Sequence, residues 1–328
     1  MTDSIALIIP NQDQADELHI LLTEIPNWTL FPDEIIIVDS SKEKFKLPSN
    51  LSKFCIEKKI SLQVIYGQNY YPGRARNIGI SSAKSEVIAF LDSATLPSSD
   101  WLRSGLCLLK EGNCQLVWGL TKYLTENSRE DIIRASSYGS FPIQTLPGTI
   151  LFSEVFKACG LFIGSARAGE DGDWIQRVEL QEIRTSVSKE ILSYTGLIGM
   201  SYLDMMKKWK RNYIFAASLP YFKVHKNLYL YPLYVLTVLF AFNWNNLFAG
   251  CDPDNFFYIS NVTKLSAFSL FMLYVILRGI IFPTKKGVKL RFLLPYRFIK
   301  VFFLSAALDL VKAIAFVQSK LKKSSPPA

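Results

Sequence analysis

PGRARNIGISSAKSEVIAFLDSATLP, Pro72–Pro97, is the stretch of the chain that decides the fold. It opens with a basic helical pattern over 74–83 and continues with the unbroken apolar run Val87–Leu91. Asp92 follows that run directly. A buried strand that ends at a polar residue is typical of parallel sheets, whose ligands bind beyond the carboxyl ends of the strands. The second residue after Asp92 is Ala94, so Asp92 is the single carboxylate of this loop.

Three more apolar runs have the length of buried strands, and helical patterns separate them. The expected strands are Ile5–Ile9, Ile35–Val38 and Leu62–Ile65, and the expected helices cover 13–25, 51–58 and 74–83. Continuous apolar strands that alternate with helices predict an α/β fold with a mainly parallel sheet covered on both faces. Such a topology gathers Pro10, Asp39 and Asp92 on one rim of the sheet.

The middle of the chain is less regular and contains several turn signals. We expect short strands within 115–170, a helix near 153–159 and a loop near 162–169. A further helix is expected to begin around 171–174. Residues 199–217 form a basic amphipathic segment.

The C-terminal part is basic and apolar. Residues 207–328 hold 18 of the 37 Lys and Arg residues but only three of the 28 Asp and Glu residues. Apolar runs over about 228–249 and 264–283 approach the roughly 20 residues needed to cross a bilayer. The segment between them has no Lys or Arg, whereas their outer flanks are basic. The positive-inside rule then predicts a multi-pass membrane protein, with a cytoplasmic α/β domain over 1–218 and a membrane-associated region over 219–328.

Charged residues interrupt the apolar run over about 292–317, so we expect an interfacial helix there. The alternative for all three apolar runs is a set of core helices in a larger soluble domain. Long apolar runs between the basic clusters favour a membrane surface over nucleic acid as partner. The five cysteines show no CxxC pairing, which argues against a zinc site or a disulfide framework and favours a reducing compartment. The N-terminus shows no secretory signal pattern.

Four blocks in order resemble family 2 glycosyltransferases, which have the GT-A fold. The blocks are IALIIPNQDQADELHILL (5–22), IIIVDSS (35–41), GRARNIGISSAKSEVIAFLDSATLPSSDWL (73–102) and GTILFSEVFKACGLFIGSARAGEDGDWIQRV (148–178). The resemblance covers about residues 4–215. It implies an inverting glycosyltransferase that moves a sugar from a nucleotide-diphosphate donor to a polysaccharide, glycolipid or lipid-linked acceptor at the cytoplasmic membrane face.

The resemblance also implies which residues bind the nucleotide sugar, namely Pro10, Asp39, Arg74, Asn77 and Asp92. Asp39 matches the carboxylate that contacts the base or the ribose, and its other interpretation is a turn at a strand end. Arg74 and Asn77 match the basic loop beside the nucleotide. A guanidinium suits diphosphate oxygens because it is permanently charged and binds bidentately.

Asp92 matches the first Asp of the family's DxD motif, which would contact a divalent metal such as Mg²⁺ or Mn²⁺. Ala94 replaces the second acid, and the Ser93 hydroxyl is a poor sole ligand for a hard cation. Metal dependence is therefore expected to be weak or absent, with cations such as Arg76 and those of 208–211 neutralising the leaving diphosphate. Arg76 alternatively pairs with a nearby carboxylate, and 208–211 alternatively anchors the protein at a membrane surface.

Asp171 matches the Asp of the family's Glu-Asp motif and would be the general base that takes the acceptor's proton. Glu170 lies beside it, and two adjacent acids in a cleft raise one pKa. Asp173 and Trp174 would contact the acceptor, although a core position is the slightly favoured interpretation of Trp174. The simpler alternative for Glu170, Asp171 and Asp173 is an acidic first helical turn that complements the helix dipole.

Three departures from the family pattern leave a second functional class open. Ser40 and Ala94 stand where acids are expected, and Tyr194 lies in the region where many members have His. The alternative is a catalytically degenerate GT-A protein that binds a nucleotide sugar or a partner without turnover. A Rossmann dehydrogenase is disfavoured because no GxGxxG follows the first strand.

Overall fold

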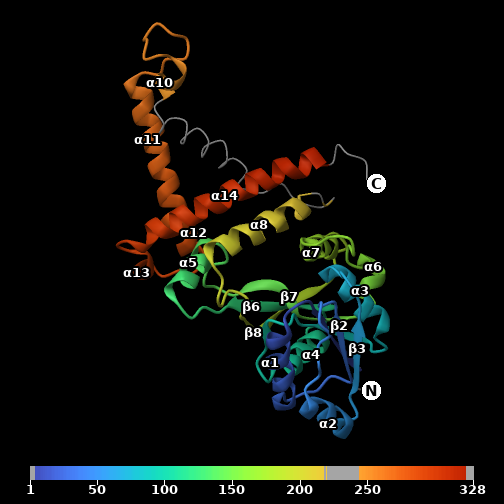
Figure 1. Ribbon diagram of the computed structural model, residues 1–328. Helices are drawn as coiled ribbons and strands as arrows, with labels where there is room; N and C mark the ends of the chain where they lie inside the picture. The colour runs from blue at the N-terminus through green and yellow to red at the C-terminus, as the bar shows by residue number, and fades with distance from the viewer. Residues whose placement is uncertain (1–3, 218, 220–243, 323–328) are drawn as a thin grey trace. The chain divides into compact units, whose positions relative to one another are not determined.

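The computed structural model describes residues 4–217, 219 and 244–322, which form two compact units (Figure 1). The first unit contains residues 4–126 and 142–199, and the second contains 127–141, 200–217 and 244–322. From the sequence, residues 127–141 and 200–217 are expected in the domain over 1–218. In the structure they belong instead to the unit that contains the C-terminal helices.

The first unit is built on an eight-stranded sheet with the order β3-β2-β1-β4-β7-β6-β8-β5. Its strands are β1 (Ile5–Asn11), β2 (Glu34–Asp39), β3 (Ser61–Tyr66), β4 (Val87–Phe90), β5 (Thr95–Leu96), β6 (Leu116–Tyr123), β7 (Ile143–Phe152) and β8 (Thr185–Tyr194). The four strands β3, β2, β1 and β4 pair in parallel. β7 runs antiparallel to β4 and β6, while β8 is parallel to β6 and antiparallel to β5. The expected mainly parallel sheet is confirmed.

Helices cover both faces of the parallel half of the sheet. The helices of this unit are α1 (Ala15–Glu24), the 3-10 turn η1 (Ile25–Asn27), α2 (Ser49–Lys58), α3 (Pro72–Ser82), α4 (Trp101–Glu111), α6 (Val155–Cys159) and α7 (Glu170–Leu180). The helices expected over 13–25, 51–58, 74–83 and 153–159 are therefore present. The helix expected to begin around 171–174 begins at Glu170.

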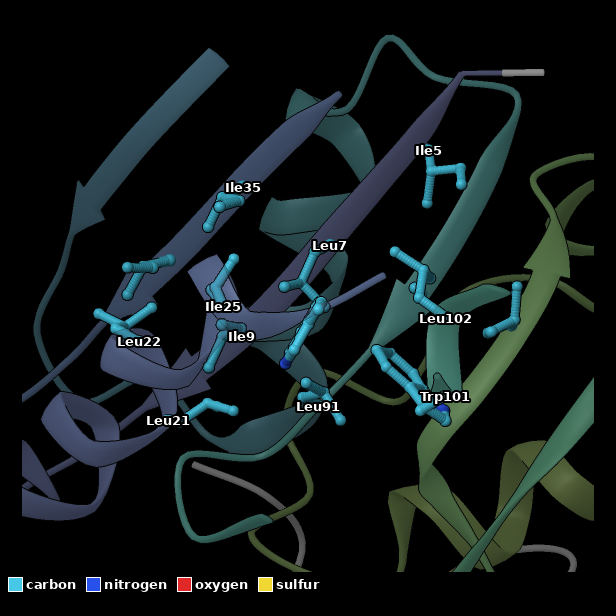
Figure 2. Close-up of a cluster of buried hydrophobic side chains, with 14 of the residues drawn as sticks. Ile5, Leu7, Ile9, Leu21, Leu22, Ile25, Ile35, Leu91, Trp101 and Leu102 are labelled. Carbon is cyan, nitrogen blue, oxygen red and sulfur yellow. The ribbon is translucent and has the colours of Figure 1, made fainter. Parts of the chain in front are cut away.

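Successive side chains of β1 point into different layers of the core because strand side chains alternate. Leu7 packs in the cluster drawn in Figure 2, together with residues of α1 and α4. Its neighbour Ile8 packs in the opposite cluster, with residues of α3, α6 and α7. Gly79 lets α3 lie close to the sheet, since a Cβ there would stand 2.4 Å from a methyl carbon of Ile8. This close approach thus packs α3 directly against β1.

The second unit is helical in its described part. Its elements are α5 (Ser128–Ser136), α8 (Tyr202–Ala216), α10 (Trp244–Phe248), α11 (Asn261–Ile276), the π-helical turn η2 (Leu277–Ile281), α12 (Phe282–Lys285), α13 (Leu290–Leu293) and α14 (Arg297–Lys322). Within this unit α14 packs along α8 and against α5, and it crosses η2. α8 lies within the basic amphipathic segment 199–217.

Two helical stretches are long and apolar enough to cross a membrane. Lys264–Lys285 has 22 residues and a mean hydropathy of 2.1, and Arg297–Ser319 has 23 residues and a mean hydropathy of 1.8. The first coincides with the expected span over 264–283. Most of the expected span over 228–249 lies outside the described residues. The interfacial placement expected for about 292–317 stays a prediction, although its helix begins at Arg297 and is long enough to span.

Candidate active site

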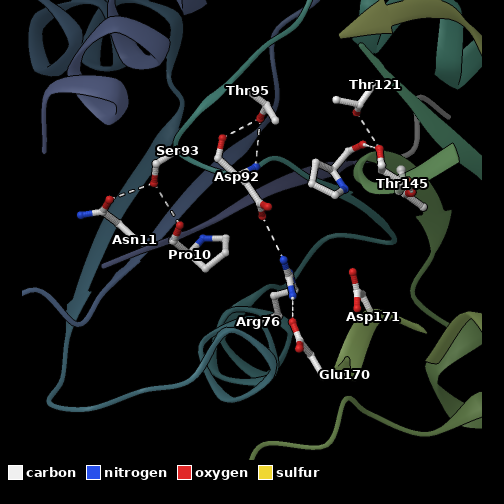
Figure 3. Close-up of polar contacts among 12 residues, drawn as sticks. Pro10, Asn11, Arg76, Asp92, Ser93, Thr95, Thr121, Thr145, Glu170 and Asp171 are labelled. Atoms are coloured by element: carbon white, nitrogen blue, oxygen red, sulfur yellow. Dashed lines mark hydrogen bonds and ion pairs between the residues drawn. The ribbon is translucent and has the colours of Figure 1, made fainter. Parts of the chain in front are cut away.

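The ends of three neighbouring strands are tied together by one buried amide side chain. Asn11, at the end of β1, donates from Nδ2 to Asp39 Oδ1 at 2.9 Å. Its Oδ1 accepts a hydrogen bond from the Ser93 hydroxyl at 2.8 Å. All three side chains are buried. The rim predicted from Pro10, Asp39 and Asp92 is therefore a single hydrogen-bonded edge of the sheet, as Figure 3 shows for Pro10, Asn11 and Ser93.

Asp39 shapes the loop that follows β2. Its carboxylate accepts hydrogen bonds from the Ser41 hydroxyl at 2.6 Å and from the Phe45 amide at 2.9 Å, besides the bond from Asn11. Burial by itself raises the pKa of Asp39, but these hydrogen bonds outweigh burial and hold the pKa below its usual value. Asp39 is thus an ionised, locally satisfied carboxylate, and its contact with a nucleotide stays a prediction.

Asp92 lies on a tight turn directly after β4. The Thr95 hydroxyl lies 2.5 Å from the Asp92 carbonyl, and the Asp92 amide donates to that hydroxyl at 3.1 Å. Ser93 points inward to β1, and Ala94 is 2 % exposed. The turn therefore aims Asp92, whose side chain is 32 % exposed, away from the core while it buries the next two residues.

A buried arginine joins this turn to the start of α7. Arg76, on α3, contacts Asp92 Oδ1 with one guanidinium nitrogen at 2.9 Å and Glu170 Oε1 with the other at 2.8 Å (Figure 3). Burial disfavours the charge of Arg76, but the carboxylates of Asp92, Glu170 and Asp171 raise its pKa above the ordinary value. Of the two interpretations of Arg76, the structure supports pairing with carboxylates. This bridge brings the predicted donor-side and acceptor-side acids together.

The two acids of the Glu-Asp pair have different surroundings. Glu170 is 4 % exposed, whereas Asp171 is exposed. Burial, followed by the charge of Asp171, raises the pKa of Glu170 to about 7 against the opposing effect of Arg76. Asp171 Oδ1 accepts from the Gly172 amide at 2.8 Å, at the first turn of α7, where the helix dipole favours a negative charge. Asp171 is thus the accessible carboxylate of the pair.

The helix α3 also holds the loop that precedes α7. Asn77 donates to the Phe162 carbonyl at 2.8 Å and accepts from the Phe162 amide at 3.0 Å. A Cβ at Gly73 would stand 2.6 Å from the Ile163 carbonyl, so only glycine permits this close approach. Arg74 is exposed, and its guanidinium lies 4.7 Å from the centre of the Tyr70 ring. Asn77 therefore positions the loop, while Arg74 faces outward from the same helix.

Two expected acceptor contacts need correction. Trp174 is fully buried, packs against Trp118 and Phe162, and donates its indole N–H to the Gly160 carbonyl at 3.0 Å. The prediction that it stacks on a sugar is wrong because no face of the ring is accessible. Asp173 is also buried, and it pairs with Arg177 one helical turn later at 2.9 Å. Both residues support α7 from inside.

The fold and the site define a class of protein before any comparison. A parallel sheet whose strand ends carry Asp39 and Asp92, with a paired acid at the start of a following helix, is the GT-A-like arrangement of nucleotide-sugar transferases. Residues 6–168 match the family model described as glycosyl transferase family 2, and the chain belongs to this family.

Relatives support the family through partial matches. An uncharacterized glycosyltransferase of Rickettsia bellii is 29% identical over 204 residues, which are 57% of this chain and 28% of that protein. The chondroitin synthase of Pasteurella multocida is 28% identical over 150 residues, 44% of this chain and 15% of the synthase. The chain thus matches less than a third of the length of these relatives.

A solved structure shares the fold. A mannosyltransferase from Pyrobaculum calidifontis, in complex with GDP-Man and Mn²⁺, aligns with a TM-score of 0.53 and 13% identity over 98% of this chain and 88% of that one. The likeness shows the fold alone.

The residues around Asp92 do not by themselves fit a divalent metal. Ala94 offers no ligand, and Ser93 is committed to Asn11. One oxygen of Asp92 already contacts Arg76, which supplies a fixed positive charge beside it. Among residues 4–217, 219 and 244–322, no group of three or more His, Cys, Asp or Glu side chains is close enough to hold an ion.

Sequence reasoning missed two residues that organise this site. Asn11 and Ser93 join β1, β2 and β4, yet sequence reasoning gave Asn11 no role and considered Ser93 only as a poor metal ligand. The sequence does contain a pattern that could have identified them, because each is a polar residue at or just beyond the carboxyl end of a buried strand. A polar side chain in that position must find partners, and the neighbouring strand ends supply them.

Proposed function

We propose that the protein is an inverting glycosyltransferase that uses a nucleotide-diphosphate sugar. The observation that carries this proposal is the Arg76 bridge, which joins Asp92 to Glu170 and leaves Asp171 exposed beside them. This arrangement supports the proposal because it places an accessible carboxylate beside the predicted donor-side Asp92.

Asp171 acts as the general base in this proposal. The acceptor hydroxyl attacks the anomeric carbon of the donor sugar while Asp171 takes the hydroxyl proton. The new carbon–oxygen bond forms as the bond to the diphosphate breaks, and the nucleoside diphosphate leaves with the bonding electrons. Attack from the face opposite the leaving group inverts the anomeric centre.

The donor occupies the rim formed by the ends of β1, β2 and β4. Asp39 and Pro10 lie beside the nucleoside, Asp92 faces the ribose or the donor sugar, and Arg74 neutralises the leaving diphosphate. Arg76 is not available for that task because it is paired with two carboxylates. Asn77 contributes indirectly, since its amide is committed to Phe162.

The acceptor in this proposal is a polysaccharide, glycolipid or lipid-linked saccharide at the cytoplasmic face of a membrane. Two apolar helical stretches of membrane-spanning length support the membrane location. Basic residues flank Lys264–Lys285 on its C-terminal side, at Lys286, Lys289 and Arg291, as the positive-inside rule expects of a cytoplasmic end.

A donor screen tests the proposal. The purified full chain is heated with each of a set of UDP-, GDP- and other nucleotide sugars, with and without Mn²⁺, and the apparent melting temperature is recorded. The donor that stabilises the protein is then supplied with a membrane extract, and nucleoside diphosphate release is measured. We expect one donor class to stabilise the protein and to be turned over. Stabilisation without turnover in any extract would favour the degenerate, binding-only alternative.

A further inference from the structure

The second unit contains a buried charge cluster that the transfer chemistry does not use. We call it the Asp309 cluster. It consists of Tyr274 on α11, Arg278 on η2, and Asp309 and Lys312 on α14. It lies where α14 crosses η2, within one compact unit. Ionisable side chains within apolar segments of membrane-spanning length are rare and usually functional. A π-helical turn at Arg278 is a second mark of a functional position.

Asp309 is the centre of the cluster. Its Oδ1 contacts Arg278 at 2.7 Å and the Lys312 ammonium at 3.7 Å, and its Oδ2 accepts from the Tyr274 hydroxyl at 2.9 Å. Tyr274 is fully buried, while Arg278 is 6 % and Asp309 5 % exposed. The Lys312 ammonium also lies 4.4 Å from the centre of the Trp209 ring on α8. The cluster is therefore desolvated on several sides.

Positive charge exceeds negative charge in this cluster. Arg278 and Lys312 share one carboxylate, and the ammonium of Lys286 lies close enough for the charges of Arg278 and Asp309 to influence it. Burial, followed by the charge of Arg278, lowers the pKa of Lys286, whereas Asp309 works in the opposite direction. Buried charge without a counter-ion is costly, so a surplus of cations indicates a missing anion.

A second observation points to a ligand. Within the part of the chain that the structure describes, the buried Nε of Arg278 has no hydrogen-bond partner. Buried guanidinium nitrogens are almost always hydrogen-bonded. This guanidinium hydrogen-bonds to Asp309 and, at 3.4 Å, to the Ser305 carbonyl, each time through the same terminal nitrogen, and it lies 5.6 Å from the centre of the Phe282 ring. Arg278 thus retains donors of the kind that bind phosphate oxygens bidentately.

The surroundings favour a lipid as the source of that phosphate. Apolar side chains of α11 are exposed, including Leu265, Phe268 and Leu273. Basic residues follow the end of the same apolar stretch, where anionic headgroups gather at a membrane surface. α14 runs along the basic helix α8 (Figure 1), a placement that suits an interfacial helix at headgroup depth.

We propose that the Asp309 cluster binds the phosphate group of an anionic lipid. Arg278 and Lys312 supply the positive charge, Asp309 contacts both cations, and the Tyr274 hydroxyl donates a hydrogen bond to Asp309. The site is independent of the transfer reaction proposed above, so its failure would leave that proposal standing. Only the choice of a lipid over soluble phosphate rests on the proposed membrane location.

Binding measured on the full chain in a neutral detergent tests the proposal. The probes are dihexanoyl phosphatidic acid, the uncharged dihexanoylglycerol and inorganic phosphate, each titrated by calorimetry. We expect phosphatidic acid to bind and dihexanoylglycerol not to bind. Lys312→Met should weaken phosphatidic acid binding roughly ten- to hundredfold, the value of a hydrogen bond to a charged group. Lys300→Met, at an exposed position of the same helix, should leave it unchanged.

A second variant, Asp309→Asn, is expected to change the affinity for phosphatidic acid in the opposite direction. Asp309→Asn keeps the side-chain shape but removes the carboxylate that competes with the phosphate for both cations, so binding should become tighter. If the cluster had a purely structural role, Asp309→Asn would bind phosphatidic acid more weakly than the wild type or equally well. Either result would overturn the proposal. Equal losses in Lys312→Met and Lys300→Met would also overturn it. If inorganic phosphate binds as tightly as phosphatidic acid, the assignment to a lipid is wrong.

Discussion

Two buried charge clusters, one in each unit, have opposite composition. In the first unit Arg76 lies between Asp92 and Glu170, so one cation serves two carboxylates. In the second unit Asp309 lies between two basic side chains, so one carboxylate serves two cations. The sign of the surplus indicates what each place is suited to bind. Surplus carboxylate suits the removal of a proton, whereas surplus cation suits an anionic ligand.

The largest expected effect on stability follows from removing the shared cation of the first cluster. Arg76→Met leaves Glu170 buried without its counter-ion, and breaking a buried pair in this way costs about 3–5 kcal/mol. Denaturant unfolding of the first unit, followed by tryptophan fluorescence, measures the loss.

Arg74→Met is the matched control two residues earlier on the same helix. Arg74 is exposed, so the variant should change stability by no more than about 0.5 kcal/mol. It should instead weaken nucleotide-sugar binding. Equal destabilisation by the two variants would contradict the central place given to Arg76.

A pH-dependent effect of intermediate size is expected at Glu170. Its pKa is about 7 in the folded protein against 4.5 as the reference value, so between these values the folded state binds more protons than the unfolded state. The free energy of unfolding of the wild type should therefore fall relative to that of Glu170→Gln as pH rises from 4.5 to 7, by about 2–3 kcal/mol. Paired unfolding curves at several pH values measure the difference, and a difference that grows in the other direction would show that Arg76 keeps Glu170 ionised.

The smallest expected effect is that of a chelator. Because Ala94 gives no ligand and Arg76 already neutralises part of Asp92, donor turnover should change little when EDTA is added. Rates measured with EDTA, with Mg²⁺ and with Mn²⁺ provide the comparison. Complete loss of turnover in EDTA would show that the donor diphosphate completes a metal site with Asp92.

Much of the first unit was predictable from the sequence, and the reason is physical. β1, β2 and β4 are buried on both faces, so they are nearly continuous apolar runs that stand out from their surroundings, whereas the edge strand β3 is only partly buried. β8 has no such pattern, because Lys189 and Glu190 interrupt it and much of its surface is exposed. The mixed half of the sheet was therefore foreseen only as short strands, and β8 was missed.

The site residues also differ in how far the sequence predicts them. Asp92, Glu170 and Asp171 belong to motifs, and the sequence places them near one another through the resemblance. The partners of Arg76 and the burial of Trp174 depend on tertiary packing, which no local pattern records. An aromatic residue at the start of a helix looks the same in sequence whether it faces a ligand or the core.

The most direct test of the account is the behaviour of Asp171→Asn once the donor is known. Turnover and donor binding are measured on the same preparation, with Glu179→Asn, at the exposed far end of α7, as the control. The account predicts that Asp171→Asn lowers turnover by about 10²–10⁴-fold, as expected for loss of a general base, while donor affinity and melting temperature stay near wild type. Wild-type turnover in Asp171→Asn would contradict the assignment of Asp171 as the base.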